Sequence, residues 1–508
     1  MYARTFGATT LGVDGMIITV EVDSSNGLPA FDIVGLPSGS VKEAKERVRT
    51  AIKNSGLYLK QERVTINLAP ADIRKEGSTL DLPIAMGLLA AHGIVPIESM
   101  SKVLFAAELS LEGTLRGISG VLPMTIQAKK EGFEKIFVAR ENANEALLVD
   151  DIEVFAPENL AQVIAHLIGE RKLSPAEKIE SDESEADEFF NDDFADVQGQ
   201  FLAKHALEIA AAGGHNVLMV GVPGSGKTML ARRVSTILPE MTKEEALEVT
   251  KIYSIAGLLK GGGLITRRPF CAPHHTSSTA ALVGGGQFPR PGAVTLSHHG
   301  ILFLDEFPEF GKASLEVLRE PLEDRKVTIS RVNATLTFPA NVTLICAMNP
   351  CPCGWRGDHD HECTCTQKEL KNYARKLSGP LLDRIDIHIN VPRVKYEEIS
   401  STIKSEPSEK IRERVVKARE IQIKRLEPYK IFCNAQMTHS MIQELCPMND
   451  QARDLLRETF MRDHISARSY DRIIKVARTI ADLDGSEIIN GDHIGEAVHL
   501  RSNLYSKA

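Results

Sequence analysis

A glycine-rich turn between an apolar run and a helix-like segment constrains the fold of this 508-residue chain more than any other feature. The run Val217–Val220 predicts a buried strand, and the segment that opens with Lys227 and Thr228 has apolar residues at helical spacing. With the turn Gly221–Gly226 between them, these residues fit the pattern G-x-x-x-x-G-K-[ST] in full. The alternative is an ordinary glycine turn before a helix, and the flanking strand and helix argue against it.

This pattern predicts a site for the phosphates of ATP and for Mg²⁺. Glycines let consecutive backbone N–H groups surround a phosphate, and the N-terminus of the following helix adds partial positive charge. Lys227 can then reach the β- and γ-phosphates, and the Thr228 hydroxyl can bind Mg²⁺. The predicted nucleotide-binding residues are Gly221, Val222, Pro223, Gly224, Ser225, Gly226, Lys227 and Thr228.

Composition excludes several other classes of protein. A hydrophobic content of 43% and a charged content of 25% are typical of soluble globular proteins. The net charge of −8 excludes a strongly basic nucleic-acid binder, although not a local basic channel. The N-terminus has no apolar signal segment, and the most apolar long stretch, 82–97, is too interrupted to span a bilayer. We therefore expect a cytoplasmic protein with no membrane partner, whose eight cysteines are thiols or metal ligands.

Patterning predicts an α/β protein of several domains. Residues 1–168 have the pattern of a mixed α/β domain, and 169–195 form an acidic linker that is disordered, extended or a solvated helix. Residues 196–395 carry the nucleotide motifs, and 396–508 are mostly helical. In the first domain we expect helices over 41–54 and 80–91 and strands over 17–22, 64–68, 103–109, 135–139 and 152–155.

Two further apolar runs end in polar side chains after the glycine-rich turn. The first ends in Asp305 and Glu306. Asp305 would hold Mg²⁺ through water, and Glu306 would polarise the attacking water. The second run ends in Asn349, whose amide could hydrogen-bond the γ-phosphate or the attacking water.

Two arginines complete the predicted catalytic set. Arg384 could stabilise charge on the transferring phosphoryl group, or it could form a salt bridge with Asp383 or Asp386. Arg468 begins an amphipathic segment that Ser466 can cap, and it could reach a nucleotide. Arg468, Arg472 and Lys475 form a basic stripe for which a solvated face is the alternative, and for Lys475 we expect that face.

A cysteine cluster lies between Asn349 and Arg384. It holds two C-x-C pairs nine residues apart, Cys351, Cys353, Cys363 and Cys365. Four thiolates from one short loop match a closed, structural Zn²⁺ site with no open position for catalysis. His359 and His361 are possible substitute ligands, and free thiols or a redox-sensitive loop are the alternatives.

The order of these motifs resembles that of an AAA+ ATPase. The resemblance assigns Walker A to Gly221–Thr228, Walker B to Asp305 and Glu306, sensor 1 to Asn349, the arginine finger to Arg384 and sensor 2 to Arg468. It also likens Asp196–Gln200 to the segment that lines the adenine pocket. Because an arginine finger acts across a subunit interface, the resemblance implies a ring, usually a homo-hexamer.

Finer features resemble the magnesium-chelatase-like branch of that superfamily. They lie in the stretches 268–276, 281–286, 291–300 and Asn349–Gly354. The branch carries an insert in its second helix and a hairpin before sensor 1, expected here near Arg325–Arg331. The replicative MCM helicases share this layout and contact DNA with such hairpins.

The N-terminal domain resembles the Lon protease domain, a fold like domain 2 of ribosomal protein S5. Lys75–Thr79 and Leu115–Leu122 correspond to the regions of its catalytic serine and lysine. Thr79, next to Ser78, takes the expected nucleophile position, and Leu122 or a neighbour takes the lysine position. A Ser–Lys dyad needs both a hydroxyl and an amine, so we expect a non-proteolytic domain.

These regions together resemble the ComM/YifB family over nearly the whole chain. The resemblance implies a C-terminal helical lid domain and an ATP-dependent helicase that promotes branch migration of DNA during natural transformation. Candidates for contact with single-stranded or branched DNA are Arg267, Arg268, Arg325, Lys326 and Arg331, each of which could equally be a surface charge. The competing functions are a chelatase-type motor with a protein or tetrapyrrole client, and an ATP-dependent protease.

Overall fold

The computed structural model describes residues 1–72, 75, 77–178, 192–259, 261–286, 289–331, 334–358, 360–394, 405–463 and 466–501. The predicted acidic linker falls mainly on residues 179–191, which lie outside this set. The chain divides into two compact units. The first unit comprises Met1–Glu183, Lys243–Ile265 and Ser330–Thr337, and the second unit comprises Ser184–Thr242, Thr266–Ile329 and Phe338–Ala508.

The first unit is built on a four-stranded sheet in the order β1-β2-β4-β3. Its strands are β1 (Tyr2–Leu11), β2 (Asp14–Ser25), β3 (Ala30–Val34) and β4 (Arg63–Ala69). Helices α1 (Gly39–Asn54) and α2 (Asp81–Ala91) pack with this sheet, and every residue of α2 is buried. Arg47 of α1 pairs with the buried Asp81 of α2 at 2.8 Å, which satisfies the carboxylate inside the apolar core.

A smaller parallel sheet, in the order β5-β8-β9, completes the first unit. Its elements are β5 (Val103–Ala106), β8 (Lys135–Val138), β9 (Glu153–Phe155), the short hairpin β6 (Glu108–Leu109) and β7 (Leu115–Arg116), and helices α3 (Val121–Lys130), α4 (Ala143–Ala146) and α5 (Leu160–Leu167). The predicted helices and strands of residues 1–168 are thereby confirmed, except that the run 103–109 is broken into two strands at Ala107. Helix α8 (Lys243–Ala256) also belongs to this unit.

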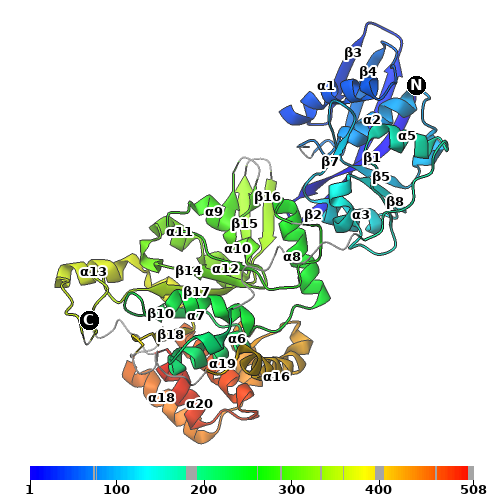
Figure 1. The fold of residues 1–508 in the computed structure, drawn as a ribbon. Coiled ribbons are helices and arrows are strands. Elements are labelled where there is room, and N and C mark those ends of the chain that lie inside the picture. The colour runs from blue at the N-terminus through cyan, green and yellow to red at the C-terminus, as the bar shows by residue number, and fades with distance from the viewer. Residues whose placement is uncertain are drawn as a thin grey trace. The chain divides into compact units, whose positions relative to one another are not determined.

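The second unit is organised by a five-stranded parallel sheet in the order β11-β14-β17-β10-β18 (Figure 1). The strands are β10 (Val217–Val220), β11 (Phe270–Cys271), β14 (Ile301–Leu304), β17 (Thr343–Met348) and β18 (Ile387–Asn390). All four residues of β10 and of β14 are buried. Such continuous apolar runs are expected of strands that are covered on both faces.

Short helices follow or connect these strands. They are α6 (Phe201–Gly213), α7 (Lys227–Arg233), α9 (Thr279–Val283), α10 (Ala293–Leu296), α11 (Lys312–Glu316), α12 (Arg319–Asp324), α13 (Gln367–Lys376) and α14 (Gly379–Leu382). A small ladder joins β12 (Gly284–Gly285) to β13 (Arg290–Pro291). The hairpin predicted before sensor 1 is also confirmed, as β15 (Lys326–Arg331) pairs with β16 (Ala334–Pro339).

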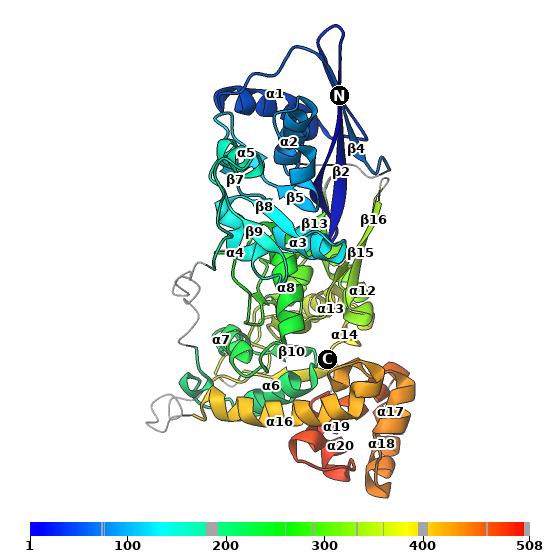
Figure 2. The same ribbon diagram turned by 90° about the vertical axis from the view of Figure 1, so that its right-hand side faces the viewer.

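The C-terminal part of the second unit is helical, as predicted. Its helices are α16 (Ser408–Leu426), α17 (His439–Leu445), α18 (Asp450–Asp463), α19 (Ala467–Leu483) and α20 (Gly491–His499). Helices α16 and α19 both pack against α6, and Figure 2 shows them together at one end of this unit. Ser466 caps α19 by accepting the N–H of Ser469, which confirms the predicted cap. No helix among the described residues is long and apolar enough to cross a bilayer.

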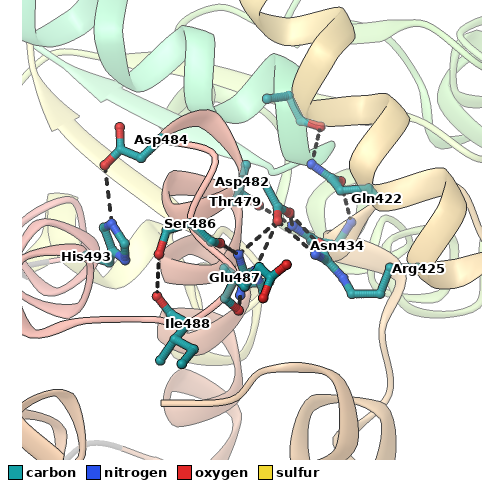
Figure 3. A network of polar contacts seen from close by, with 12 residues as sticks. Gln422, Arg425, Asn434, Thr479, Asp482, Asp484, Ser486, Glu487, Ile488 and His493 are labelled. Atoms are coloured by element: carbon teal, nitrogen blue, oxygen red, sulfur yellow. Dashed lines mark hydrogen bonds and ion pairs between the residues drawn. The ribbon is translucent and has the colours of Figure 1, made fainter. Parts of the chain in front are cut away.

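A buried polar network joins α16 to α19 (Figure 3). The Asp482 carboxylate, 2% exposed, accepts hydrogen bonds from Arg425 at 2.6 and 2.8 Å and from Asn434 at 2.8 Å. Arg478 lies 3.0 Å from the same carboxylate. The backbone N–H of Asn434 donates to Gln422 of α16 at 2.9 Å. The network therefore satisfies a buried charge while it fixes the two helices and their connection.

Candidate active site

The glycine-rich turn follows a strand in the middle of the parallel sheet. Strand β10 lies between β17 and β18, and α7 begins at Lys227 as predicted. A side chain at Gly221 would place its Cβ 2.3 Å from the carbonyl oxygen of Val391, so only glycine fits there. Gly226 has φ of 88°, a conformation that also favours glycine. The conformation of the turn therefore requires glycine at both Gly221 and Gly226.

Lys227 and Thr228 point toward the predicted catalytic groups. The Lys227 ammonium, 8% exposed, donates to the carbonyl oxygens of Gly221 at 2.9 Å and Val222 at 3.0 Å, and it lies 3.4 Å from Asn349 Oδ1. Burial lowers the pKa of Lys227, and the Asp305 carboxylate opposes that shift. The Thr228 hydroxyl donates to Asp305 Oδ2 at 2.7 Å. The two predicted Mg²⁺ ligands are thus adjacent.

Asp305, Glu306 and Asn349 reach this site because parallel strands end at the same edge of a sheet. Asp305 follows β14 and Asn349 follows β17, and Leu304 pairs with Cys346 in the register of these strands. A cavity of about 400 Å³ forms there. Its lining includes Lys227, Asp305, Glu306, Asn349, Tyr373 and Lys376. Four of the six predicted catalytic residues therefore converge on one cavity.

A second cavity of about 460 Å³ lies beside the glycine-rich turn. Its lining comes from three segments: residues 200–203 at the start of α6, residues 388–390 with 392 and 393, and residues 499 and 500. The amide of Gln200 donates to Pro392 O at 2.6 Å and to Ser225 O at 3.3 Å. The segment that resembles an adenine pocket thus ends at this cavity and contacts the turn directly.

Arg384 and Arg468 are not among the residues that line these cavities. The Arg384 guanidinium is buried, and it pairs with Glu323 at 2.7 Å rather than with Asp383 or Asp386. Arg468 lies 3.8 Å from the same Glu323 carboxylate. The structure therefore groups these two arginines around one carboxylate, separately from the other predicted catalytic residues.

Two other basic residues of α19 are less exposed than the sequence suggests. Arg472 forms an ion pair with the buried Asp386, and Lys475 donates to Ala435 O at 3.3 Å. Burial lowers the pKa of Lys475, and the pKa of Asp386 is held low by Arg472 and His215 against the effect of burial. A solvated face for Lys475 was therefore the wrong expectation, because this part of α19 packs against the segment that contains Ala435.

The four cysteines of the cluster come together as predicted. Cys351 Sγ lies 3.3 Å from Cys353 Sγ and 3.6 Å from Cys363 Sγ, and the Cys353 N–H points at Cys365 Sγ at 3.3 Å. All four sulfurs lie within 4.8 Å of one another. Zn–S bonds of about 2.3 Å in a tetrahedron place sulfurs about 3.8 Å apart, so the cluster is consistent with a zinc site.

Neither of the histidines proposed as substitute ligands is placed among the four sulfurs by the described residues. The His361 ring stacks on Trp355 with centroids 4.2 Å apart, and its Nδ1 lies 3.2 Å from Asp358. His361 is accordingly held by these partners rather than grouped with the sulfurs. His359 lies outside the described residues.

The cysteine loop also packs on the nucleotide-binding turn. A Cβ at Gly354 would lie 2.7 Å from Pro223 Cγ, so this loop touches the turn directly. On its other side, the Tyr373 hydroxyl donates to the Asn349 carbonyl at 3.0 Å. Neither contact was predictable from the spacing of the cysteines.

His275 is a further contact that the sequence analysis missed. Its Nδ1 lies 2.9 Å from Glu306 Oε2, although it belongs to the loop after β11. In the sequence, the stretch 268–276 is notable only for its resemblance to the chelatase-like branch. The pairing itself had no sequence signal, because the two residues meet only when β11 and β14 lie side by side.

Comparison with known proteins covers nearly the whole chain. Three family profiles match in succession: "Subunit ChlI of Mg-chelatase" over residues 20–142, "Magnesium chelatase, subunit ChlI" over 193–399, and "Magnesium chelatase, subunit ChlI C-terminal" over 405–501. The competence protein ComM of Haemophilus influenzae is 43% identical over 503 residues, which are 98% of this chain and 97% of that protein. YifB of Escherichia coli is 41% identical over 97% of this chain and 95% of its own length.

The chain belongs to the magnesium-chelatase-like ComM/YifB family. Residues 193–399 are therefore an ATPase module of the ChlI type. A ComM/YifB chain is expected to bind ATP and Mg²⁺, and the cavity that contains Lys227 and Asp305 has the residues to do so.

The first unit of this ComM/YifB protein is also similar to Lon proteases. Lon protease 2 of Bacillus subtilis is 27% identical over 149 residues, which are 28% of this chain and 26% of that protein. Leu122 is fully buried, and the Ser78 hydroxyl donates to Glu108. The buried Lys75 donates to the carbonyls of Gly35 and Pro70. The Ser78 hydroxyl and the Lys75 amine are thus each occupied by another partner.

Proposed function

We propose that this ComM/YifB protein is an ATP-driven ring motor that moves single-stranded or branched DNA, acting as a helicase that promotes branch migration. The observation that carries the motor chemistry is the convergence of Lys227, Asp305, Glu306 and Asn349 on one cavity. These residues suit a bound Mg–ATP, which would supply the reactive γ-phosphoryl group. The Thr228 hydroxyl would bind the metal, Asp305 would hold it through water, and Lys227 would neutralise the phosphates.

Glu306 is the base in this proposal. Its carboxylate lines the cavity and would take a proton from the attacking water. Asn349 would orient that water or hydrogen-bond the γ-phosphate. The cavity next to Gln200 would accept the adenine, because it adjoins the turn through Ser225 and is lined largely by apolar groups.

Arg384 and Arg468 would act on the nucleotide of a neighbouring subunit in a homo-hexamer. This assignment is supported by their grouping at Glu323, apart from the residues of their own nucleotide cavity. A positive guanidinium supplied from the neighbour would stabilise charge on the transferring phosphoryl group. Hydrolysis would then depend on the assembled ring.

DNA would be contacted by the β15–β16 hairpin. Lys326 is exposed at the start of β15, next to the buried Val327. Arg325 and Arg268 instead donate to backbone carbonyls, Arg325 to Ala435 and Arg268 to Pro239 and His299.

With Arg325 and Arg268 engaged by backbone carbonyls, the exposed Lys326 is the candidate DNA contact on this hairpin, and the side chain of Arg331 lies outside the described part. Such contacts bind phosphates without sequence preference and weaken as salt is added. The similarity to a competence protein over 98% of the chain supports DNA as the client.

We propose that the cysteine cluster holds a structural Zn²⁺. The thiolates of Cys351, Cys353, Cys363 and Cys365 would be its four ligands, with sulfurs already within 4.8 Å of one another. Its role would be to fix the loop that packs on Pro223 and continues from Asn349.

The test of the DNA motor is the ATPase rate with and without single-stranded and branched DNA, for the wild type and Glu306→Gln. We expect DNA to stimulate hydrolysis, and Glu306→Gln to retain ATP while hydrolysis slows by about 10²–10⁴-fold. Stimulation should decline steeply with salt. Hydrolysis that ignores DNA at every salt concentration would contradict the DNA client and leave the ATPase assignment intact.

A chelatase-type motor is the second candidate, because all three matching profiles describe the ChlI subunit. In that case a protein or tetrapyrrole client, rather than DNA, would stimulate hydrolysis. A Lon-type protease receives less support, because Leu122 provides no amine. Degradation of a labelled protein substrate in the presence of ATP would instead favour a protease.

A further inference from the structure

A segment from the middle of the ATPase sequence packs as part of the first unit. Residues 243–265 lie between two stretches of the second unit in the sequence, yet their contacts place them with residues 1–178. The segment comprises α8 and the turn that follows it. It contacts α3 and α4 of the first unit.

The centre of this contact is a buried carboxylate. Glu145 of α4 is 4% exposed, and it accepts the N–H of Leu122 at 2.8 Å and the side-chain amide of Asn142 at 3.1 Å. The Ser254 hydroxyl of α8 donates to the same carboxylate. In return, the Gly120 N–H donates to Ser254 O at 3.1 Å. Ser254 therefore satisfies two polar groups of the first unit, the backbone N–H of Gly120 before α3 and the carboxylate of Glu145 in α4.

Further contacts extend along the segment on both sides of Ser254. Lys251 pairs with Asp14 at 3.1 Å, and the Asn144 amide donates to Gly261 O at 3.1 Å. Gly262 has φ of 69°, and a Cβ there would lie 2.9 Å from the backbone nitrogen of Glu145. The turn after α8 thus approaches α4 more closely than any residue with a side chain would allow.

We infer that the α3–α4 face of the first unit is a docking surface for residues 243–265 of the same chain. The face is defined by Gly120, Leu122, Asn144 and Glu145. The face includes Leu122, the position at which the Lon resemblance places a catalytic lysine. In this protein that part of the fold contacts helix α8 instead.

The docked segment follows closely in the sequence after the residues proposed to bind the nucleotide. Helix α8 is joined to α7, which carries Lys227 and Thr228, by residues 234–242 alone. These nine residues therefore join the helix that carries Lys227 and Thr228 to a helix that packs with the first unit. The acidic linker is not needed for this connection.

The first experiment separates docking from covalent tethering. A protease recognition sequence is placed within residues 179–191 of the full chain, and the purified protein is cleaved there. We expect the fragment that contains residues 1–178 to co-elute with the remainder on size exclusion at physiological salt. Separation of the two fragments, each still folded by circular dichroism, would overturn the inference.

A substitution on α8 then tests which segment holds the fragments together. Ser254→Leu should separate the cleaved fragments, because it removes the hydroxyl and places an apolar side chain against Glu145. Glu244→Leu is the matched control, since Glu244 is exposed on the same helix, and its fragments should stay together. Continued co-elution of the Ser254→Leu fragments would show that another segment carries the contact and would refute the docking surface.

A charge exchange guards against a simple folding defect. Lys251→Glu faces Asp14 with a like charge and should weaken fragment association by about fivefold, an effect reduced by salt. Adding Asp14→Lys should restore association, because the pair is re-formed with its charges reversed. Absence of both the loss and the rescue would count against docking through this pair.

Discussion

Thr228 and Asp305 are 77 residues apart in the sequence, yet the Thr228 hydroxyl donates to Asp305 Oδ2 at 2.7 Å. The contact exists because α7 begins beside the edge of the sheet at which β14 ends. It places a hydroxyl and a carboxylate together where Mg²⁺ would need both.

Thr228→Val should therefore impair the use of Mg–ATP more than the binding of nucleotide alone. Valine keeps the shape of threonine but removes the oxygen ligand, and we expect kcat to fall at least about tenfold. Thr228→Ser should retain most activity. The measurement is ATPase rate against Mg²⁺ concentration, and an unchanged Mg²⁺ dependence in Thr228→Val would exclude this residue as a ligand.

Arg384→Ala should leave ATP affinity within a few-fold of wild type while turnover falls by about 10²-fold or more. If Arg384 acts on a neighbour's nucleotide, mixing Arg384→Ala with Lys227→Ala subunits should restore some hydrolysis, because some interfaces then contain an intact lysine and an intact arginine. Activity that stays at the level of the unmixed variants would contradict action in trans.

Cys363→Ser should reduce the zinc content of the purified protein and lower its affinity for ATP. The loop that it helps to hold packs on Pro223 and adjoins Asn349, so the effect should reach the nucleotide. Cys271→Ser is the control, because Cys271 lies outside the cluster. Zinc is measured by release to a chromophoric chelator, and equal zinc in all three proteins would favour free thiols.

Asp482→Ala should destabilise the helical domain by about 3–5 kcal/mol, because the buried Arg478 and the partly buried Arg425 lose the carboxylate that neutralises their charge. Asp484→Ala is the control, since Asp484 is exposed and makes one pair with His493 at 3.2 Å. Its effect should stay below about 1 kcal/mol. Urea unfolding followed by circular dichroism measures both, and equal midpoints would contradict the role given to Asp482.

His388 should make the protein less stable as the pH falls. Burial, with a contribution from Arg501, lowers the pKa of His388 to about 4, below its ordinary value of 6.5. The unfolded chain therefore takes up a proton before the folded one, and stability is lost between these two values as pH decreases. From about pH 6.5 to about pH 5 the loss should be about 1.5 kcal/mol.

His388→Asn should remove that part of the pH dependence. The comparison is the thermal midpoint of wild type and variant across this range, since other titrating groups contribute equally to both. Parallel curves for the two proteins would show that His388 is protonated equally in the folded and unfolded states.

Several elements of the site followed from local sequence. The strand, turn and helix around Lys227, the strand ends at Asp305 and Asn349, and the paired cysteines are all specified by short spacing patterns. Such patterns act through backbone conformation and strand direction, so a single segment is enough to predict them. The cap at Ser466 was predictable for the same reason.

By itself, then, the sequence determined the order of the domains, the fold class and four of the residues that line the cavity at the end of the sheet, Lys227, Asp305, Glu306 and Asn349. Only the tertiary structure decided that Arg384 pairs with Glu323, that His275 reaches Glu306, and that residues 243–265 pack with the first unit. Each of these depends on a partner contributed by another segment of the chain. Such a choice is made by packing and charge compensation between segments, and no local periodicity encodes it.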